Sequence, residues 1–555
     1  MSPLSSRSLS SLKSSLPSTS RVEHNRNLHL SQFLHQPLDR INVLGNDDGT
    51  YGHTGCVNAL SWAHNGEILM SGGDDTTVRL WRMDSSDTEQ EYPFVCRSVI
   101  HTGHTGNIFN AQLLPYSSHL ITVAADKQIR VSDINMATNN GAQDSLETHY
   151  TTKQSVKKVL RCHDDRVKRV VTEDSPALFL TVSEDGSVRQ HDLRKPHNCR
   201  QNTCPTPLVK LSHEASTVSL STLTPYQFVV AGEAPYGYLF DRRNVGRRIE
   251  EEWGVPPSTD EITTCVRRFG RPPSTDKKKR FPRDHITGSR MSNYNGHEIL
   301  LSYNGDASYL FSTLDEPTES PPSSTFTSSS TTPKAKQSKL SQSRVPQRFS
   351  SLSTVPDLAE PQPNLDCRPD TGTPTAQDHD AREELEDDPD EKNEESSEDE
   401  IEEEEALEME NNYRPGVPTV QPRKRFAGAR NVETVKDVNF IGPNDELVVS
   451  GSDDGNFFVW DKPTARLHGI YEGDGSVVNV IEGHPSLPLV AVSGIDTTVK
   501  LFAPAGGISQ FSRLGNADQI LQANARPVAR FDLRTMLAEA LLRSGSSSSS
   551  ECVYQ

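Results

Sequence analysis

One spacing recurs along this chain and constrains its fold more than any other feature. A polar residue stands 28 positions before the end of a short alternating stretch, and an aspartate stands six positions before the same end. The longer spacing links His53 to Trp81, His104 to Ser132, His163 to His191 and Asp474 to Phe502. The aspartates at the shorter spacing are Asp75, Asp126, Asp185, Asp454 (before Trp460) and Asp496. Because the two spacings recur together, the sequence indicates one structural unit copied along the chain.

Each copy has the pattern of several short strands. Stretches such as VNALSW (57–62), EILMSG (67–72) and TVRLW (77–81) are separated by turns rich in Gly, Asp and Asn. A period of about 50 residues, with Gly-His near its start and Trp-Asp near its end, resembles the WD repeat. One four-stranded unit cannot bury both of its faces, so the resemblance implies units stacked radially into a β-propeller.

The resemblance also implies a hydrogen-bonded network inside each unit. In a WD repeat, the His before the first strand bonds a Ser or Thr of the second strand, and the turn Asp and the Trp complete the network. The first unit holds the complete set, His53, Ser71, Asp75 and Trp81. The second and third units keep the His, a Thr and the Asp, but they have Ser132 and His191 where the Trp would stand. We interpret these residues as structural and not catalytic.

Seven units can be proposed, which predicts an all-β, seven-bladed WD-repeat β-propeller. We expect the fifth blade to begin with ITTCVRR (262–268) and to resume, after a loop at about 267–297, with EILLSYNGDASYLFS (298–312). In WD propellers the outer strand of a blade follows the closing position, so the seventh blade lacks one. The stretch RINVLG (40–45) lies in the right place to supply it, which would close the ring and hide two sheet edges.

Segments outside the units differ in composition. The run between Asp378 and Glu410 holds 20 acidic residues against two basic ones, and Ser, Thr and Pro dominate before it. Such segments cannot bury enough apolar surface to fold alone, so we expect disorder there. The expected organisation is a disordered Ser-rich tail (1–27), a helix (28–39), the first propeller part with its closing strand (40–312), a disordered acidic insert (313–421), the last two blades (422–504) and a C-terminal tail with a short helix (505–555). At the N-terminus, disorder is favoured over an organellar transit peptide.

Two neighbouring units end in the same tripeptide pattern, Asp-x-Arg. Asp192-Leu193-Arg194 closes the third unit, and Asp241-Arg242-Arg243 closes the fourth. A guanidinium is always charged and presents a rigid fork of donors that suits carboxylates or carbonyls of a partner. An Arg after a strand is also common as a solvated or intrablade ion pair, so the tripeptide alone leaves both interpretations open.

The wider sequence resembles the WD-repeat substrate receptors of cullin-4 ubiquitin ligases, the damaged-DNA-binding-protein adaptor-associated factors. The similarity is carried by the Asp-x-Arg endings and by stretches such as GHTGCVNAL (52–60) and FLTVSEDGSVR (179–189), and it is greatest to subfamily eight with its relatives six and five. The resemblance implies that Asp192, Arg194, Asp241 and Arg243 bind the ligase adaptor. It implies a non-enzymatic receptor that recruits a protein substrate of unknown identity. The alternative is a nuclear WD-repeat scaffold with no ligase role.

A short helix is predicted ahead of the propeller, at 28–39. Its apolar residues Leu28, Leu30, Phe33 and Leu34 fall on roughly one face, and Pro37 ends it. This face could dock in a groove of the adaptor, or it could pack on the propeller itself, and the sequence leaves both open.

Charged segments suggest further partners. Lys277, Lys278, Lys279 and Arg280 form a candidate nuclear import signal, with PRKR (422–425) as a second, and we expect a nuclear and cytoplasmic protein. Direct nucleic-acid binding is disfavoured because aromatic residues do not interleave with the basic ones. The acidic insert is a candidate contact for histones or other basic proteins, although a solvated spacer is the commoner outcome for such a run.

Neither a metal nor a cofactor is expected. His197, Cys199 and Cys204 lie close in sequence, but their spacing matches no familiar zinc motif and a fourth ligand is missing, so we interpret them as loop residues. The eight cysteines are scattered without a CxxC pair, which indicates a reducing compartment. No apolar run approaches the roughly 18–20 residues that span a bilayer, so no membrane partner is expected. Phosphate loops, nucleophile elbows and convergent carboxylate pairs were not found, which argues against an enzyme.

Overall fold

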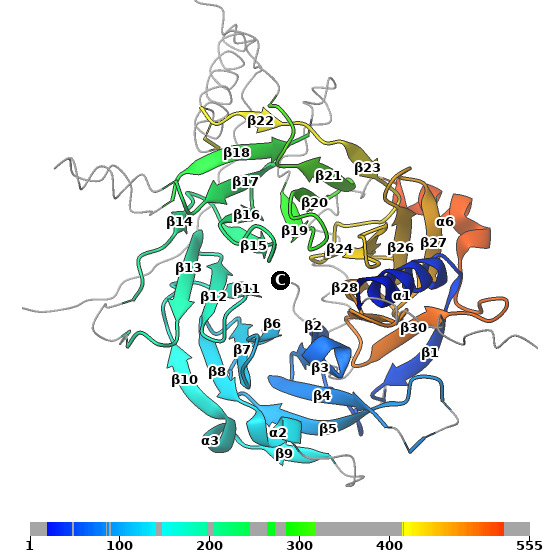
Figure 1. Cartoon of the computed structure of the whole chain (residues 1–555), viewed down its shortest axis with the longest axis horizontal. Coiled ribbons are helices and arrows are strands. Elements are labelled where there is room, and N and C mark those ends of the chain that lie inside the picture. Colours follow the sequence, from blue (N-terminus) through cyan, green and yellow to red (C-terminus); the bar gives the residue numbers. More distant parts are fainter. Residues whose placement is uncertain are drawn as a thin grey trace, which may run out of the picture. The chain divides into compact units, whose positions relative to one another are not determined.

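Seven sheets, each built on four antiparallel strands, surround a central axis, as the sequence predicts for a seven-bladed propeller (Figure 1). The computed structural model describes residues 19–46, 49–84, 86–87, 90–139, 147–196, 199, 204–244, 263–271, 285–317, 413–414 and 416–526. All of them belong to one compact unit, Met1–Ser320 with Glu408–Gln555. The import motif (277–280) and nearly all of the predicted acidic insert lie outside the described residues.

The strands of each blade follow one another outwards from the axis. The innermost strands are β2 (Val57–Ala63), β6 (Ile108–Leu113), β11 (Val167–Thr172), β15 (Ala215–Leu220), β19 (Ile286–Met291), β24 (Val438–Ile441) and β28 (Val478–Gly483). The second strands are β3 (Ile68–Gly73), β7 (His119–Ala124), β12 (Leu178–Ser183), β16 (Gln227–Gly232), β20 (Glu298–Tyr303), β25 (Leu447–Gly451) and β29 (Val490–Gly494).

The outer strands of the blades vary more in length than the inner ones. The third strands are β4 (Thr77–Met83), β8 (Ile129–Asp133), β13 (Ser187–Asp192), β17 (Tyr236–Asp241), β21 (Ser308–Ser312), β26 (Asn456–Asp461) and β30 (Val499–Pro504). The outermost are β5 (Phe94–His101), β10 (Val156–Leu160), β14 (Val209–Lys210), β18 (Cys265–Gly270), β23 (Lys424–Phe426), β27 (Leu467–Glu472) and β1 (Leu38–Leu44). Two short strands, β9 (Thr148–Tyr150) and β22 (Thr419–Val420), add to β5 and β18 in parallel.

Helices occupy the connections and the two ends of the described chain. They are α1 (Thr19–Leu34), α2 (Asn135–Asn139), α3 (Thr152–Ser155) and α6 (Ala517–Asn524), with the 3-10 turns η1 (His64–Gly66) and η4 (Leu514–Asn516). Within the described residues, no helix has the length and apolar character needed to cross a membrane.

Burial explains why the middle strands read as apolar runs. Every residue of β25 and β29 is buried, because both faces of the strand lie against neighbouring blades. The cores therefore lie between blades: Trp81 of the first blade is fully buried in one cluster with Val480 and Leu501 of the seventh. Removing this apolar surface from water is the main term that holds the blades together.

The ring is closed by the N-terminal strand, as predicted. β1 pairs with β30 in antiparallel register, from Leu38 opposite Pro504 to Leu44 opposite Val499. The last blade thus combines three strands from the end of the propeller with one from its beginning, which removes two exposed sheet edges. In the fifth blade, β21 pairs with β23, so the long insert lies between the third and outer strands as expected.

Two predictions about element boundaries are wrong. The stretch assigned to the start of the fifth blade is instead β18, the outer strand of the fourth blade, paired with β17 from Tyr236 opposite Gly270. The fifth blade begins at β19, so the preceding loop joins two blades. The predicted helix at 28–39 is also displaced: α1 starts at Thr19, inside the segment expected to be a disordered tail, and ends at Leu34 because Pro37 and β1 follow.

Candidate functional site

Strand direction sorts the predicted residues onto two faces of the ring. Neighbouring strands are antiparallel, so the first and third strands of a blade run the same way. The Asp-x-Arg sequences follow third strands and therefore emerge on the side where first strands end. We call this the corner face, defined by Asp192–Arg194 and Asp241–Arg243. The opposite side, defined by His53, His104 and His163, is the histidine face.

On the histidine face, the first blade forms a continuous hydrogen-bond chain. His53 Nδ1 lies 2.9 Å from Asp75 Oδ2, and His53 Nε2 lies 2.7 Å from Ser71 Oγ. Ser71 Oγ in turn accepts from Trp81 Nε1 at 2.7 Å. Burial would raise the pKa of Asp75, but hydrogen bonds from His53 and Thr77 outweigh it and lower this pKa to about 2.

The third blade explains why a histidine stands in the tryptophan position. Thr181 Oγ1 lies 2.8 Å from His163 Nε2 and 2.9 Å from His191 Nε2, so the His191 ring supplies the N–H that Trp81 supplies in the first blade. His163 Nδ1 lies 3.0 Å from Asp185 Oδ2. The His191 ring also stacks on Phe179, with 4.9 Å between ring centroids, as an aromatic core residue would.

In the second blade the hydrogen-bond network ends one residue earlier, at Thr122. His104 Nδ1 lies 3.0 Å from the Asp126 carboxylate, and His104 Nε2 lies 2.9 Å from Thr122 Oγ1. The Ser132 hydroxyl is buried without a hydrogen-bond partner among the described residues. The small side chain therefore fills the tryptophan position without joining the network.

The last two blades replace the histidine with buried ion pairs that sequence reasoning missed. In the sixth, Lys436 pairs with Asp453, and both side chains are at most 1% exposed. In the seventh, Lys500 lies between Asp474, which stands where the His would be, and Asp496. The available signal was the missing His together with a Lys, which stands just before the innermost strand in the sixth blade and within the third strand in the seventh.

The two remaining predicted network residues have other partners. Trp460 Nε1 donates to the Ala427 carbonyl at 3.2 Å, since the sixth blade has no His-Ser relay. Asp454 accepts from the Asn456 backbone N–H at 3.2 Å and from Asn524 Nδ2 of α6 at 2.9 Å. The C-terminal helix thus takes part in closing the turn of this blade.

Charged side chains in or next to the innermost strands pair between blades that are not neighbours. Arg169 of β11 contacts Asp437, which precedes β24. Arg290 of β19 pairs with Glu482 of β28. These carboxylates are neutralised by guanidinium groups, an arrangement that suits a structural centre better than acid–base catalysis.

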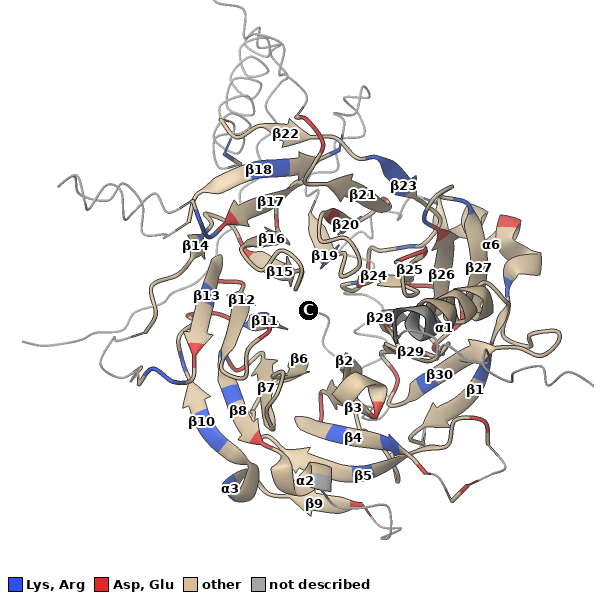
Figure 2. Cartoon of the chain, viewed as in Figure 1, with Lys and Arg blue, Asp and Glu red and all other residues tan. Residues whose placement is uncertain are grey.

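On the corner face, both Asp-x-Arg sequences adopt the same geometry. Arg194 donates from Nε to Asp192 Oδ1 at 2.8 Å and from Nη2 to Asp192 Oδ2 at 3.0 Å. Arg243 donates in the same way to Asp241, at 2.9 Å and 2.6 Å. In each corner the backbone N–H of the Arg also donates to the same carboxylate, at 3.0 Å and 2.9 Å. Figure 2 shows the acidic residue at the end of β13 and of β17.

The carboxylates in these corners are far less exposed than the guanidinium groups, which face water. The Asp192 and Asp241 side chains are 14% and 9% exposed, whereas those of Arg194 and Arg243 are 67% and 64% exposed. Hydrogen bonds from the Arg side chains hold the pKa of each aspartate below its ordinary value, so both pairs stay ionised at neutral pH. The Nη1 group of each Arg has no hydrogen-bond partner among the described residues.

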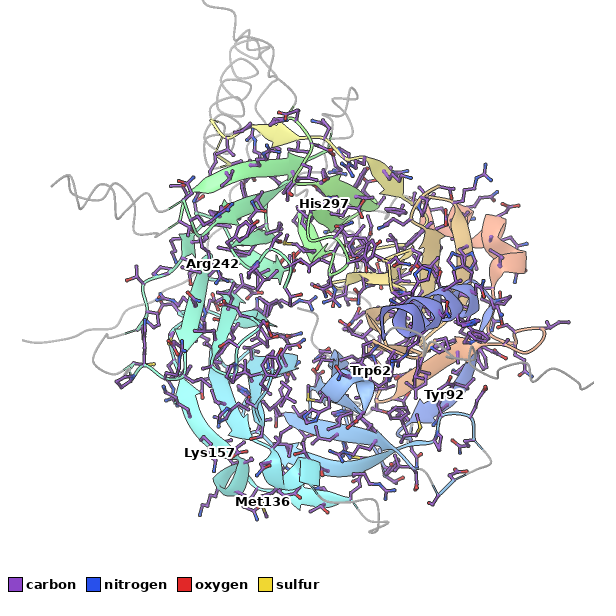
Figure 3. The ribbon with its side chains drawn as sticks, viewed as in Figure 1. Trp62, Tyr92, Met136, Lys157, Arg242 and His297 are labelled. Carbon is purple, nitrogen blue, oxygen red and sulfur yellow. The ribbon has the colours of Figure 1, made fainter. Side chains whose placement is uncertain are left out.

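Adjacent arginines in the fourth blade have different roles. Arg242 (labelled in Figure 3) lies between the third and fourth blades, where its Nη1 donates to Glu173 Oε2 at 2.9 Å. Arg243 instead lies over the Tyr226 ring, 3.7 Å from its centroid, with its free edge outwards. Only the second of the two is therefore available to a partner.

The helix α1 lies on the same face as the two corners. Arg26 Nη2 donates to the carbonyl of Ser486, in the turn that follows the first strand of the seventh blade, at 3.4 Å. Leu30 and Leu34 are buried against the sixth and seventh blades, so the helix packs on the propeller. Leu28 and Phe33 from the same predicted apolar set remain 50% and 46% exposed.

Three cysteines converge that sequence spacing did not connect. Sγ atoms of Cys162, Cys199 and Cys204 all lie within 4.8 Å of one another. Cys162 escaped notice because it is 37 residues before Cys199, so only the packing of the second blade on the third brings them together. His197 lies outside the described residues.

Comparison with known proteins agrees with this architecture. The WD40 family (WD domain, G-beta repeat) matches residues 46–82 and 421–461, which contain parts of the first and sixth blades. The chain is therefore a WD-repeat protein that folds as a seven-bladed propeller, a fold that typically serves as an interaction domain.

Three curated relatives indicate the wider group. The chain is 36% identical over 49% of its length to WD repeat protein iqw1 of Schizosaccharomyces pombe, covering 32% of that protein. It is 23% identical to human WD and tetratricopeptide repeats protein 1, over 84% of this chain and 85% of that one. It is 27% identical over 48% of its length to mouse DDB1- and CUL4-associated factor 6, covering 27% of that protein. The match thus spans about a third of the length of the first and third of these relatives.

Proposed function

We propose that this chain is the substrate-recognition subunit of a cullin-4 RING ubiquitin ligase, which binds the ligase adaptor through its corner face. The observation that carries the proposal is the pair of matching corners, in which Asp192 and Asp241 hold Arg194 and Arg243 pointing outwards from neighbouring blades. The similarity to a relative named as a DDB1- and CUL4-associated factor supports the same assignment.

The corners are suited to docking because they are preorganised. Each carboxylate engages Nε and Nη2 of its Arg, which fixes the guanidinium plane and leaves Nη1 to donate to a partner. A side chain already fixed in one orientation loses less conformational entropy on binding. Two such groups from one rigid ring would match acceptors at a fixed separation on the adaptor, which favours specificity over charge attraction alone.

The helix α1 supplies a second contact in this proposal. Its Leu30 and Leu34 hold it to the propeller, while Leu28 and Phe33 remain exposed on the side of the ring that carries the corners. An apolar helix surface of this kind can enter a groove of another protein. The two uses of the helix that the sequence left open are therefore compatible: one side packs on the propeller and the other meets the adaptor. The histidine face is left for the protein substrate.

Affinity purification with mass spectrometry tests the proposal. The full chain should recover the cullin-4 adaptor from cells, and Arg194→Ala/Arg243→Ala should lose it. Lys195→Ala is the matched control, since it removes an exposed positive charge next to the corner but leaves both Asp-x-Arg pairs intact. Recovery of other nuclear proteins without the adaptor would instead support the scaffold alternative.

A further inference from the structure

The cysteine cluster lies where two blades meet. Cys162 follows β10, the outer strand of the second blade, and Cys199 and Cys204 belong to the connection between β13 and β14 of the third. Cys162 is buried, and the other two are partly buried against the apolar core between these blades. The three thiols therefore come from two separate segments and point into one interblade space.

The spacing of the sulfur atoms fits metal coordination. Zinc–thiolate bonds of about 2.3 Å in a tetrahedron place neighbouring sulfurs about 3.8 Å apart. Cys162 Sγ and Cys199 Sγ are 3.7 Å apart, and the third sulfur lies within 4.8 Å of both. A disulfide would require about 2.0 Å. The three sulfurs thus lie close to the corners of one tetrahedral face without any bond between them.

The surroundings favour bound thiolates over three free thiols. The Arg161 backbone N–H donates to Cys199 Sγ at 3.2 Å, as a second-shell donor does to a metal-bound sulfur. Three thiolates so close together repel one another unless a cation lies between them, and divalent zinc supplies that charge and binds thiolate ligands.

The fold also explains why a crosslink would be useful at this point. β14 is two residues long and pairs only with Ser187 and Val188 at the start of β13. Among the described residues, the outer strand of the third blade is therefore shorter than the outer strand of any other blade. A metal that joins its connection to Cys162 would fasten this edge to the second blade where backbone hydrogen bonds do not.

We propose that Cys162, Cys199 and Cys204 bind one zinc(II) ion as thiolates and so link the third blade to the second. Binding replaces three S–H bonds by three S–Zn bonds and releases three protons, with no change in oxidation state. This proposal rests on the positions of the three cysteines and not on adaptor binding, so the zinc measurements test it separately from the proposed function.

Metal analysis of the purified full chain tests the site. The protein is prepared in reductant with a tag that lacks histidine, loaded with zinc chloride and desalted, and zinc per chain is measured by plasma mass spectrometry. We expect about one zinc per chain, as for a structural site. Cys199→Ser/Cys204→Ser should lose it, and Cys265→Ser, a partly buried cysteine outside the cluster, should retain it. Cobalt in place of zinc should give the intense visible absorption of tetrahedral thiolate coordination.

A second measurement needs no variant and so does not depend on how well one folds. In the wild-type chain, zinc should protect these three cysteines from alkylation by N-ethylmaleimide, and a chelator should remove the protection. The proposal would be overturned if the wild-type protein holds far less than one zinc per chain or if zinc does not slow the alkylation of these cysteines. A disulfide within the cluster would also overturn it.

Discussion

The buried ion pair of the sixth blade gives the sharpest test of how the propeller is held together. Replacing Lys436 by Met removes the only ammonium that contacts the Asp453 carboxylate among the described residues, and both side chains are at most 1% exposed. An uncompensated buried charge costs about 3–5 kcal/mol. The backbone N–H groups of Val432 and Glu433 still donate to Asp453 Oδ2, at 2.6 Å and 3.1 Å. We therefore expect the lower end of that range, about 3 kcal/mol.

Hydrogen–deuterium exchange measures this loss where it occurs. A decrease of about 3 kcal/mol in local opening free energy makes amide exchange in β24, β25 and β26 roughly a hundredfold faster. Lys127→Met is the control, because its partner Asp165 is a surface residue and both side chains are about half exposed. Adding Asp453→Asn to Lys436→Met should recover part of the loss. Equal exchange in Lys436→Met and Lys127→Met would refute the reasoning that the buried pair replaces the histidine network.

Three further perturbations follow from the same contacts. The pKa of Asp75 is about 2 in the fold against 3.8 in the unfolded chain, which adds about 2 kcal/mol to the free energy of unfolding above pH 4 and is lost as the pH falls to 2. In urea unfolding, Asp75→Asn should lack this acid-dependent loss of stability. An equal dependence of the unfolding free energy on pH in the variant and the wild type would contradict the prediction. His191→Phe should lower the free energy of unfolding by about 1–3 kcal/mol, because the buried Thr181 hydroxyl loses its hydrogen-bond donor. Ser132→Ala at the matching position of the second blade should change the urea midpoint little. Equal shifts of the urea midpoint in the two variants would contradict the role given to His191 in the hydrogen-bond network. Leu30→Ala should weaken the packing of α1 on the propeller by about 2 kcal/mol, which limited proteolysis would detect as faster cleavage of the helix. Phe33→Ala should leave the cleavage rate unchanged. Faster cleavage in Phe33→Ala than in Leu30→Ala would contradict the packing described for the helix.

Features set by local spacing could be predicted from the sequence. The distance from His53 to Trp81 is fixed by the lengths of three strands and two turns, so the recurring offset implied the blade, and the blade count followed. The closing strand could be inferred because the last blade lacked a partner. The paired Arg residues were visible for the same reason, since each follows a third strand by two positions.

Features set by packing between distant segments could not. Cys162 is close to Cys199 only because two blades pack together. In the sixth blade, the ion pair between Lys436 and Asp453 stands in place of the expected hydrogen bonds of a histidine. β18 was misplaced because a short apolar stretch with basic residues fits an inner strand as well as an outer one. The first turns of α1 are polar, so no apolar periodicity marked where the helix begins.

The most direct test of the central claim is the dissociation constant of the purified full chain for the purified cullin-4 adaptor. If the two guanidinium groups are the docking contacts, Arg194→Ala/Arg243→Ala should weaken binding by roughly tenfold or more, as loss of interface arginines does. Arg194→Lys/Arg243→Lys should also weaken it, because lysine lacks the rigid fork, and Lys195→Ala should bind as the wild type does. A double alanine variant that remains folded and binds with unchanged affinity would contradict the account.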